Sequence, residues 1–410
     1  MRLGDTDVPY SHEFKLLITT KLANPHYLPE ICIKVTLINF TVTPEGLEDQ
    51  LLVDVVKYEQ PELEQQKDQL VVQLSGFKRQ LQETEAKILK LVSEASDDIL
   101  NDEELIITLD QSKETSIVIT DKMVEAEQTA KMINENRESY RSVARRGSVL
   151  YFVVADLALV DPMYQYSLEF FTRLFNRRLD KSEKSEVLQD RLAILIADVT
   201  ESFFLNICRG LFEKDKLLYS FLNAASVLRR AGDITVEEWN CYLRGTTTDF
   251  SSHTNDVAYL EEKTYHKLLG LEEAHFSFKD ITKSFADAGD SATWKRILSA
   301  EEPSAISLPP LYEDRLSPFQ KLMLARVLRE EKLVPAIKAF VGAELGELFT
   351  ESPPFDLEGA ADDSTPGTPV IFVLSPGADP IADLIALAQA RGMGERIKIL
   401  SLGQGQGPIA

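Results

Sequence analysis

The chain has 410 residues, of which 44% are hydrophobic and 27% are charged, as is ordinary for a folded globular protein. Its formal net charge of −22 argues against nucleic acid or an anionic membrane surface as a partner, because both require a basic face. The length allows two or three domains. Cys32, Cys208 and Cys241 lie too far apart for a disulfide framework or a metal site, which fits a reducing compartment.

No sequence segment indicates a membrane span, a secretory signal or a metal site. Apolar runs fall short of the ~18 residues of a membrane helix, and no charged-then-apolar signal opens the chain. The histidines have no ligand spacing, so we expect no bound metal; they are His12, His26, His253, His266 and His275. The polar start and the glycine-rich end of the chain both read as cuts through a larger protein.

Two strands and a helix are predicted in the first 58 residues. Residues 14–20 (FKLLITT) and 33–40 (IKVTLINF) are rich in apolar and β-branched side chains, as strands are. Thr43-Pro44 then predicts a helix start, with Thr43 as the N-cap and Pro44 as the first helical residue.

The most informative pattern is a pair of apolar seams, at 63–95 and 105–140, separated by the acidic break Ser96-Asp97-Asp98. Both seams alternate steps of three and four residues, which is the repeat of a coiled coil. The first consists of Leu63, Leu70, Leu74, Phe77, Leu81, Ile88, Leu91 and Ala95, with Lys67 and Thr84 as polar interruptions. The second consists of Leu105, Leu109, Ile119, Met123, Ala126, Ala130, Ile133 and Tyr140, with Ser112, Ser116 and Arg137 as interruptions. Each stripe needs a partner helix, so the sequence predicts an antiparallel hairpin roughly 50 Å long, from a rise of about 1.5 Å per residue.

The region after the hairpin is predicted to be mostly helical. Residues 149–157 (VLYFVVADL) fit either a buried strand or a core helix. Asp161-Pro162 predicts the cap of a helix that carries Met163, Tyr166, Phe170 and Leu174. Helical stripes follow between about 185 and 300, Gly232 predicts a helix end, and capping boxes are predicted at 235–238 and 317–320.

The end of the chain has the strand–turn–helix–strand order of an α/β domain. Strands are predicted at 369–375 and 396–402, after a small, acidic linker at about 355–368. The turn Ser375-Pro376-Gly377-Ala378-Asp379 occupies the place of a phosphate-binding loop. However, residues 371–390 contain no Lys or Arg, and Asp379 is placed to cap the helix end that a phosphate would need. We therefore interpret it as a degenerate phosphate loop and expect no bound cofactor. The alternating glycines at 403–407 lack the spacing of a dinucleotide fingerprint.

Several long strings resemble axonemal dynein heavy chains, in the same order and over nearly the whole chain. Residues 19–30 (TTKLANPHYLPE), 39–52 (NFTVTPEGLEDQLL), 59–64 (EQPELE) and 161–168 (DPMYQYSL) resemble the fifth AAA+ module. Residues 372–380 (FVLSPGADP) and 401–408 (SLGQGQGP) resemble the opening of the sixth.

The resemblance implies a mainly α fold with α/β parts: AAA+ module fragments, a long antiparallel coiled-coil hairpin and a helical lid. It implies that 1–58 is the C-terminal part of the fifth module, 59–140 the buttress or strut hairpin, and 141–184 the return segment of that module. Residues 185–345 would then be the lid region, and 346–410 the linker and the truncated start of the sixth module.

The implied function is a non-catalytic part of a motor ring that transmits force in ciliary or flagellar movement. No catalytic residue is expected, because family hydrolysis resides in earlier modules; ATP and Mg²⁺ would belong to the intact motor. The implied partners are the stalk and neighbouring modules of the heavy chain, its intermediate and light chains and, indirectly, microtubules, in the cytoplasm and the axonemal cytoskeleton. Two alternatives stay open: a stand-alone coiled-coil scaffold, and a nucleotide-binding enzyme that uses the C-terminal α/β segment.

Overall fold

The computed structural model describes residues 2–3, 5–7, 9, 11, 13–20, 27–38, 41–94, 103–245, 250 and 252–399. The chain divides into two compact units, Met1–Thr43 and Pro44–Ala410. In the first unit, strand β1 (Arg2–Leu3) pairs antiparallel with β2 (Thr6–Asp7), and α1 (Pro29–Cys32) is a single helical turn.

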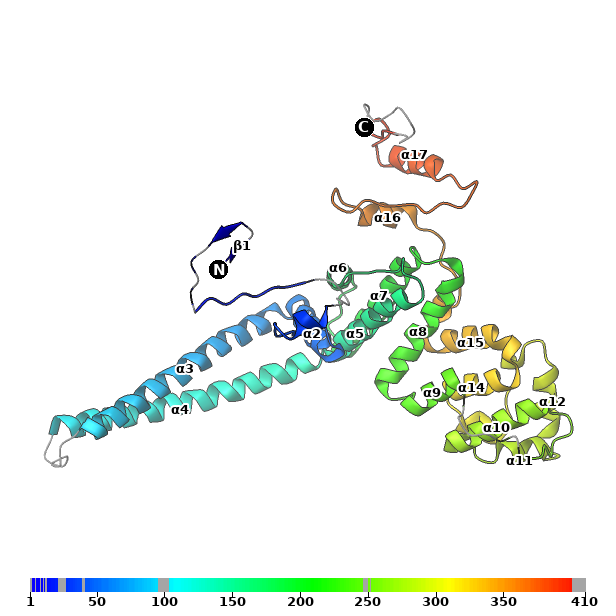
Figure 1. Ribbon diagram of the computed structural model, residues 1–410, viewed down its shortest axis with the longest axis horizontal. Coiled ribbons are helices and arrows are strands. Elements are labelled where there is room, and N and C mark those ends of the chain that lie inside the picture. The colour runs from blue at the N-terminus through cyan, green and yellow to red at the C-terminus, as the bar shows by residue number, and fades with distance from the viewer. Residues whose placement is uncertain are drawn as a thin grey trace. The chain divides into compact units, whose positions relative to one another are not determined.

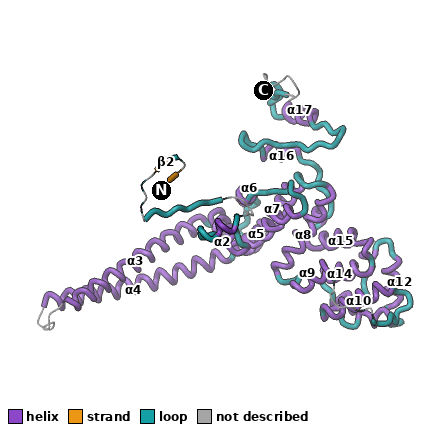
Figure 2. Tube along the Cα trace, in the orientation of Figure 1, coloured by secondary structure: helices purple, strands orange, loops and turns teal. Residues whose placement is uncertain are grey.

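The second unit is built from helices (Figures 1 and 2). Its longer helices are α2 (Pro44–Glu59), α3 (Pro61–Glu94), α4 (Glu103–Glu138), α5 (Arg141–Asp156), α6 (Leu168–Lys181), α7 (Leu188–Cys208), α8 (Glu213–Ala231), α9 (Val236–Arg244), α10 (Glu262–Ala274), α12 (Ser291–Ser299), α14 (Pro318–Leu328), α15 (Leu333–Leu345) and α17 (Ile381–Ala390). The shorter ones are α11 (Ile281–Ala286), α13 (Pro310–Arg315), α16 (Leu357–Asp363) and the 3-10 turns η2 (Leu157–Leu159), η3 (Phe276–Phe278), η4 (Pro303–Ala305), η5 (Glu330–Lys332) and η6 (Glu347–Phe349). None of the described helices is long and apolar enough to cross a membrane.

The predicted coiled-coil hairpin is confirmed. Helices α3 and α4 run side by side and antiparallel, and they pack against each other along their length (Figure 1). Every seam side chain that the structure describes is buried or half-buried, whereas most side chains between the seam positions are exposed. The break at 96–98, Ala95 and the side chains of Leu91, Leu105 and Leu109 lie outside the described residues. The step pattern therefore identified the contact face of both helices.

The core of the second unit lies among α5, α7, α8 and the helices that follow them. The stripe on α7 that the sequence predicted is buried: it comprises Leu195, Val199, Phe203, Ile207 and, just past the helix end, Leu211. Residues 149–157 are helical, because α5 extends through them and η2 follows. Helix α8 ends at Gly232, whose φ of 91° is in the left-handed region. Both predicted capping boxes are present, at Thr235–Glu238 and Ser317–Gln320.

The predicted start of the helix after the hairpin is wrong. The Asp161 carboxylate accepts a hydrogen bond from the Met163 N–H at 2.9 Å, which closes a turn and not a helix. Helix α6 begins later, at Leu168, where the Ser167 hydroxyl accepts from the Phe170 N–H at 3.1 Å. A serine with an extended backbone and a free downstream N–H is the better cap, so it sets the boundary.

The predicted strands at 14–20, 33–40, 369–375 and 396–402 are also wrong for the residues that the structure describes there. Their backbone makes no strand pairing within the described ranges; Asn39, Phe40 and residues 400–402 lie outside them. The apolar side chains are exposed instead, to 90% at Leu17 and 82% at Ile371. A strand requires hydrogen bonds to a neighbouring strand, and apolar composition alone does not supply that neighbour.

Candidate functional site: the base of the hairpin

The second helix of the hairpin continues into the core of the second unit. Helix α4 ends at Glu138 and α5 begins at Arg141, and Tyr140 between them keeps a helical backbone, with φ −90° and ψ 0°. Backbone bonds from Tyr140 N to Arg137 O (3.0 Å) and from Val143 N to Tyr140 O (3.1 Å) carry the turn across the joint. Helix α5 then buries Val143, Ala144, Leu150 and Val154. A displacement of α4 is therefore applied directly to a buried helix.

The first helix of the hairpin, α3, is joined to α2 at a proline. Helix α2 ends at Glu59 and α3 begins at Pro61, which has no N–H to continue the backbone ladder. Gln60 N still donates to Val56 O at 2.8 Å, and Leu63 N to Gln60 O at 3.1 Å. The two ends of the hairpin are thus attached differently, one through a two-residue turn with helix-like hydrogen bonds and one through a proline step.

A buried carboxylate on α2 joins the hairpin to α8. Glu48 is only 3% exposed, and its oxygens lie 3.1 Å from Arg141 Nη1 and 3.2 Å from Arg230 Nη2. Arg145 Nε lies 3.7 Å away. Arg141 also donates to Asp49 at 2.9 Å and to Glu138, and these carboxylates, Glu138 first, raise its pKa above the ordinary value. Since removing one partner of a buried ion pair leaves an uncompensated charge, this cluster fixes the root of α4 against α2 and α8.

A second ionic cluster holds the joint between α2 and α3. Glu59 accepts hydrogen bonds from Arg191 of α7, at 2.7 and 2.9 Å, and from Lys184 at 3.2 Å. Arg191 is 2% exposed and also donates to the backbone carbonyl oxygens of Leu179 and Glu183. Burial alone would raise the pKa of Glu59, but the bonds from Arg191 and Lys184 outweigh it and hold that pKa below 4.5. One arginine thereby links the hairpin joint to the end of α6.

Two polar interruptions of the seams, Arg137 and Lys67, both contact Glu64 at the base of the hairpin. Arg137 of α4 lies 2.9 Å from Glu64 of α3, as an ion pair without hydrogen-bond alignment, and Lys67 donates to the same carboxylate at 3.3 Å. Arg137 is 8% and Glu64 5% exposed. A charged pair at this position specifies one alignment of the two helices, because a shift of one helix would bury an unpaired charge.

Close approach of three helices requires glycine at position 147. A Cβ atom there would lie 2.8 Å from Phe175 of α6 and 2.9 Å from Leu51 of α2. The side chains of Phe175 and Leu51 are almost fully buried, at 0% and 1% exposed. Gly147 therefore lets α5 pack tightly between α2 and α6, which stiffens the base of the hairpin.

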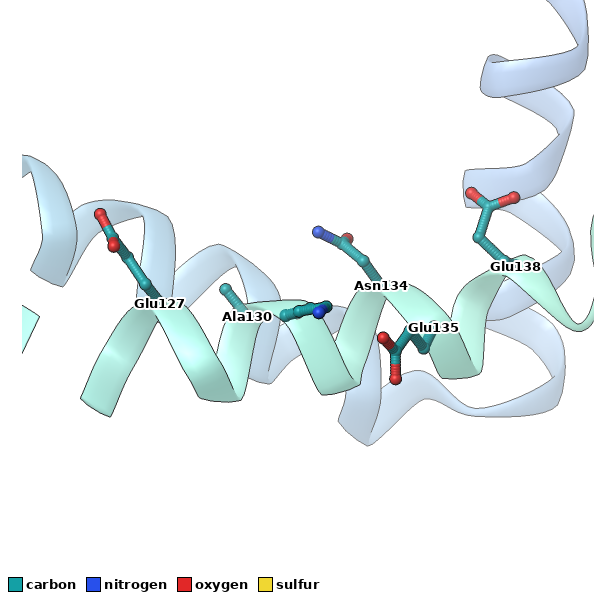
Figure 3. Close-up of a pocket in the computed structure, with 6 residues that line it drawn as sticks. Glu127, Ala130, Asn134, Glu135 and Glu138 are labelled. Atoms are coloured by element: carbon teal, nitrogen blue, oxygen red, sulfur yellow. The ribbon is translucent and has the colours of Figure 1, made fainter. Parts of the chain in front are cut away.

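A mostly acidic hollow lies along α4 near this base, beside the seam (Figure 3). The hollow measures about 530 Å³ and is lined by Glu127, Ala130, Lys131, Asn134, Glu135 and Glu138. These residues recur at helical spacing on one face, so the hollow follows the helix axis. All six are exposed except the half-buried Ala130.

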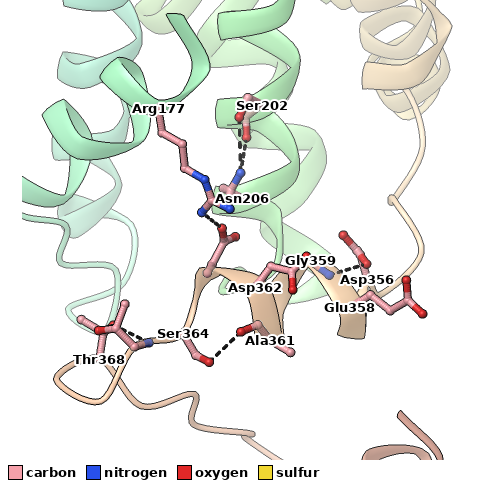
Figure 4. A network of polar contacts seen from close by, with 12 residues as sticks. Arg177, Ser202, Asn206, Asp356, Glu358, Gly359, Ala361, Asp362, Ser364 and Thr368 are labelled. Atoms are coloured by element: carbon pink, nitrogen blue, oxygen red, sulfur yellow. Dashed lines mark hydrogen bonds and ion pairs between the residues drawn. The ribbon is translucent and has the colours of Figure 1, made fainter. Parts of the chain in front are cut away.

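Short helix α16, which precedes the C-terminal segment, is tied to α6 and α7 by charge (Figure 4). Asp363 pairs with Arg177 and, at 2.6 Å, with Arg209, and Asp356 lies 3.1 Å from Arg209. Asp356 also caps α16 by accepting from the Gly359 N–H at 2.9 Å. Two arginines of the body therefore position the connection to residues 364–399.

The predicted phosphate-loop-like turn is a tight turn followed by a helix whose first N–H is bound by Asp379. Gly377 has φ 90°, and Ala378 N donates to Ser375 O at 3.0 Å. Helix α17 begins at Ile381, and the Asp379 carboxylate accepts a hydrogen bond from the Ile381 N–H at 2.9 Å. All five turn residues are exposed. The glycines at 403–407 lie outside the described residues.

Neither ionic cluster, nor the contacts of α16, has a signal in the sequence pattern. Glu48, Glu59, Arg141 and Arg191 are spaced as surface charges on their own helices, and only the fold brings them together. One signal was available: Arg137 interrupts an apolar seam, and a charge in such a seam calls for a partner.

Comparison with known proteins gives a consistent result along the chain. A family described as the ATP-binding dynein motor region matches residues 1–119, and the dynein heavy chain region D6 P-loop domain matches residues 365–410. Human dynein axonemal heavy chain 6 is 42% identical and human dynein axonemal heavy chain 3 is 41% identical, each over 100% of this chain. Mouse dynein axonemal heavy chain 2 is 38% identical, again over 100% of the chain.

The chain spans about a tenth of the length of these relatives: 10% of the first two and 9% of the third. The first match covers the first helix of the hairpin and part of the second, the other covers the end of the chain, and both follow the order in which the sequence strings resemble that family. With the fold, the base of the hairpin and these matches together, the chain belongs to the axonemal dynein heavy chains.

Proposed function

We propose that this chain is a force-transmitting part of a dynein motor ring, in which the α3–α4 hairpin acts as a strut against the stalk. The observation that carries the proposal is the attachment of the hairpin. A two-residue turn joins α4 to buried α5, and Glu59 and Glu48 tie the two ends of the hairpin to α7 and α8. A stiff hairpin that is anchored at one end and fixed in register can transmit a displacement by moving between two discrete positions.

The proposed division of the chain follows the resemblance. Residues 1–58 are assigned to the fifth AAA+ module, 59–140 to the strut, 141–184 to the return segment, 185–345 to the lid region and 346–410 to the linker and the start of the sixth module. The family matches at 1–119 and 365–410 agree with the two ends of this assignment.

The turn at 375–379 is proposed to hold no nucleotide. A triphosphate needs a basic side chain and free N–H groups at a helix start, whereas this turn offers the Asp379 carboxylate bound to the Ile381 N–H. ATP and Mg²⁺ are therefore assigned to other modules of the intact motor, and no residue of this chain is proposed to be catalytic. The intact protein is proposed to act on microtubules in the axoneme, together with intermediate and light chains.

The strut proposal is tested by shortening the hairpin in the heavy chain that contains this segment. Removing residues 77–83 and 118–124, which face each other in the register set by Glu64 and Arg137, shortens it by about 10 Å. We expect the ratio of microtubule affinities between nucleotide states to fall toward one while basal ATP hydrolysis continues. The control keeps the length and replaces the exposed Gln80 and Asp121 by alanine. A wild-type affinity ratio in the shortened motor would refute the strut.

A further inference from the structure

A cavity far along the chain from the hairpin base lies between α14, α15 and the segment 303–308. It measures about 370 Å³, which is within the range of small-molecule sites in proteins. Its inner wall is apolar: Ile297, Leu322 and Phe340 are each at most 4% exposed. The extended residues Ile306 and Leu308 form part of the opposite wall and pack against the same core.

The cavity exists because one face of α15 carries small side chains. Ala336, Ala339 and Ala343 recur at steps of three and four, so they lie on one face of the helix, and all three line the cavity. Ala339 and Ala343 are exposed at its rim, which leaves the cavity open to solvent. Apolar walls that are not in contact forgo the dispersion energy of close packing, and an apolar ligand would recover it.

The rim of the cavity is positively charged although the chain carries a net charge of −22. Lys321, Arg329 and Lys332 line it, against Glu313 as the one carboxylate among the described lining residues. Lys321 is paired with Glu313, and Arg329 is paired with Glu331 and donates to the carbonyl oxygens of Ile297 and Ala300 at the end of α12.

Lys332 remains available, and it occupies the N-cap position of α15. That helix start has no side-chain cap and no acidic residue in its first turn. The positive end of the helix dipole therefore adds to the charge of the lysine.

We propose that this cavity binds a small amphipathic anion, namely a carboxylate with a medium-length alkyl chain. The chain lies against Ile297, Leu322 and Phe340, and the carboxylate pairs with the Lys332 ammonium at the start of α15. A nucleotide does not fit walls that are mostly apolar, because its base and sugar would lose their hydrogen bonds to water. Binding here would join the 303–308 segment to the α14–α15 pair.

The probe is decanoate, titrated calorimetrically into the 410-residue chain, with decanol as the uncharged analogue. We expect saturable binding at one site. Ala339→Trp, which fills the cavity from its rim, should abolish binding of both compounds. Lys332→Glu replaces the charge pair by a repulsion between two carboxylates, so it should weaken decanoate by at least about tenfold and leave decanol unchanged. Lys338→Glu, an exposed position of α15 outside the lining, is the matched control and should bind both compounds like the wild type.

Circular dichroism checks that each variant is folded, and Ala343→Phe replaces Ala339→Trp if the latter is not. The proposal is overturned by non-saturable binding of decanoate, by wild-type binding in the filled-cavity variant, or by equal weakening in Lys338→Glu and Lys332→Glu. Binding of decanol that falls together with decanoate in Lys332→Glu would also overturn it, because the lysine would then shape the cavity without pairing with the carboxylate.

Discussion

Arg141 and Glu48 are 93 positions apart in the sequence, yet Arg141 Nη1 lies 3.1 Å from Glu48 Oε1. The pair joins the first residue of α5, at the root of the hairpin, to the buried face of α2. Because Arg230 at the end of α8 reaches the other oxygen of Glu48, three helices meet at one carboxylate. This relationship makes the base of the hairpin a single mechanical unit.

Glu48→Gln should destabilise the chain by about 1–3 kcal/mol. The amide keeps the shape of the carboxylate but leaves Arg141, Arg145 and Arg230 facing a neutral group, and partial exposure of the arginines limits the loss. Urea unfolding measures the effect. Glu45→Gln is the control, since Glu45 is 69% exposed and pairs with the same Arg230; solvent screens that pair, so the substitution should leave the stability nearly unchanged. Equal effects of both substitutions would contradict the role given to Glu48.

Glycine-to-alanine substitutions at two helical positions should change the free energy of unfolding in opposite directions. At Gly147 the new methyl group would meet Phe175 and Leu51 below 3 Å, so we expect a loss of about 1–3 kcal/mol. At Gly76 of α3 nothing lies within 4 Å, so the better helix propensity of alanine should stabilise the chain by about 0.5–1 kcal/mol. Thermal unfolding of the two variants side by side checks both signs. A stabilising Gly147→Ala would show that α5 is not tightly packed there.

The polar seam residues Ser112 and Ser116 distinguish a flexing strut from a rigid one. Ser112 is 7% exposed and Ser116 is half-buried, so Ser112→Leu with Ser116→Ile should strengthen the seam by about 1–2 kcal/mol in total. If the hairpin must bend at these residues, a heavy chain with both substitutions should couple ATP turnover to microtubule binding less well. Unchanged coupling would mean that the two serines only fix the register. Thr115→Leu, at an exposed position of the same turn, controls for added apolar surface.

Acid should weaken the base of the hairpin. The pKa values of Glu59 and Glu138 are lower in the folded chain than the ordinary 4.5, Glu138 mainly through its hydrogen bond from Arg141. A carboxyl whose pKa is depressed by folding stabilises the folded state above its unfolded pKa. That contribution is lost as the pH falls through the folded pKa. The contribution of Glu59 and Glu138 to the free energy of unfolding should therefore be present above pH 4.5 and should decline below it.

The measurement is urea unfolding from about pH 7 to about pH 3, with Glu59→Gln as the test variant. The variant should be less stable at neutral pH and should lose less stability on acidification than the wild type. Glu127→Gln, at an exposed position on the outer face of α4, should leave the pH dependence unchanged. Parallel pH profiles for Glu59→Gln and the wild type would exclude a contribution from the Glu59–Arg191 pair.

The sequence predicted the elements whose signals are local. Seam periodicity identified both helices of the hairpin, Pro44 marked the start of α2, and the capping boxes at 235 and 317 appeared as expected. In each case the determining contact lies within one helix or between two helices of complementary pattern. The prediction of the start of α6 was wrong because Asp161 and Ser167 are both side chains that can cap a helix. Only the turn in the folded chain decides between them.

The strands and the ionic clusters could not be predicted for a different reason. An apolar run such as 369–375 becomes a strand only when another strand is beside it, and the sequence of the run does not contain that neighbour. Glu48 and Arg230 are separated by 182 positions, so no spacing rule relates them. Hydrophobic periodicity identifies which face of a helix is buried, but it does not reveal which charges the packing brings together.

We infer that α4 is held rigidly to the core helices through α5 and the clusters at Glu48 and Glu59. Spin labels at the exposed positions Val124 of α4 and Ala197 of α7, in a chain with its native cysteines replaced by serine, measure this directly by pulsed electron resonance. We predict a single narrow distance distribution that broadens when Glu48→Gln and Arg191→Met are combined. A broad distribution in the chain without these two substitutions would contradict the claim.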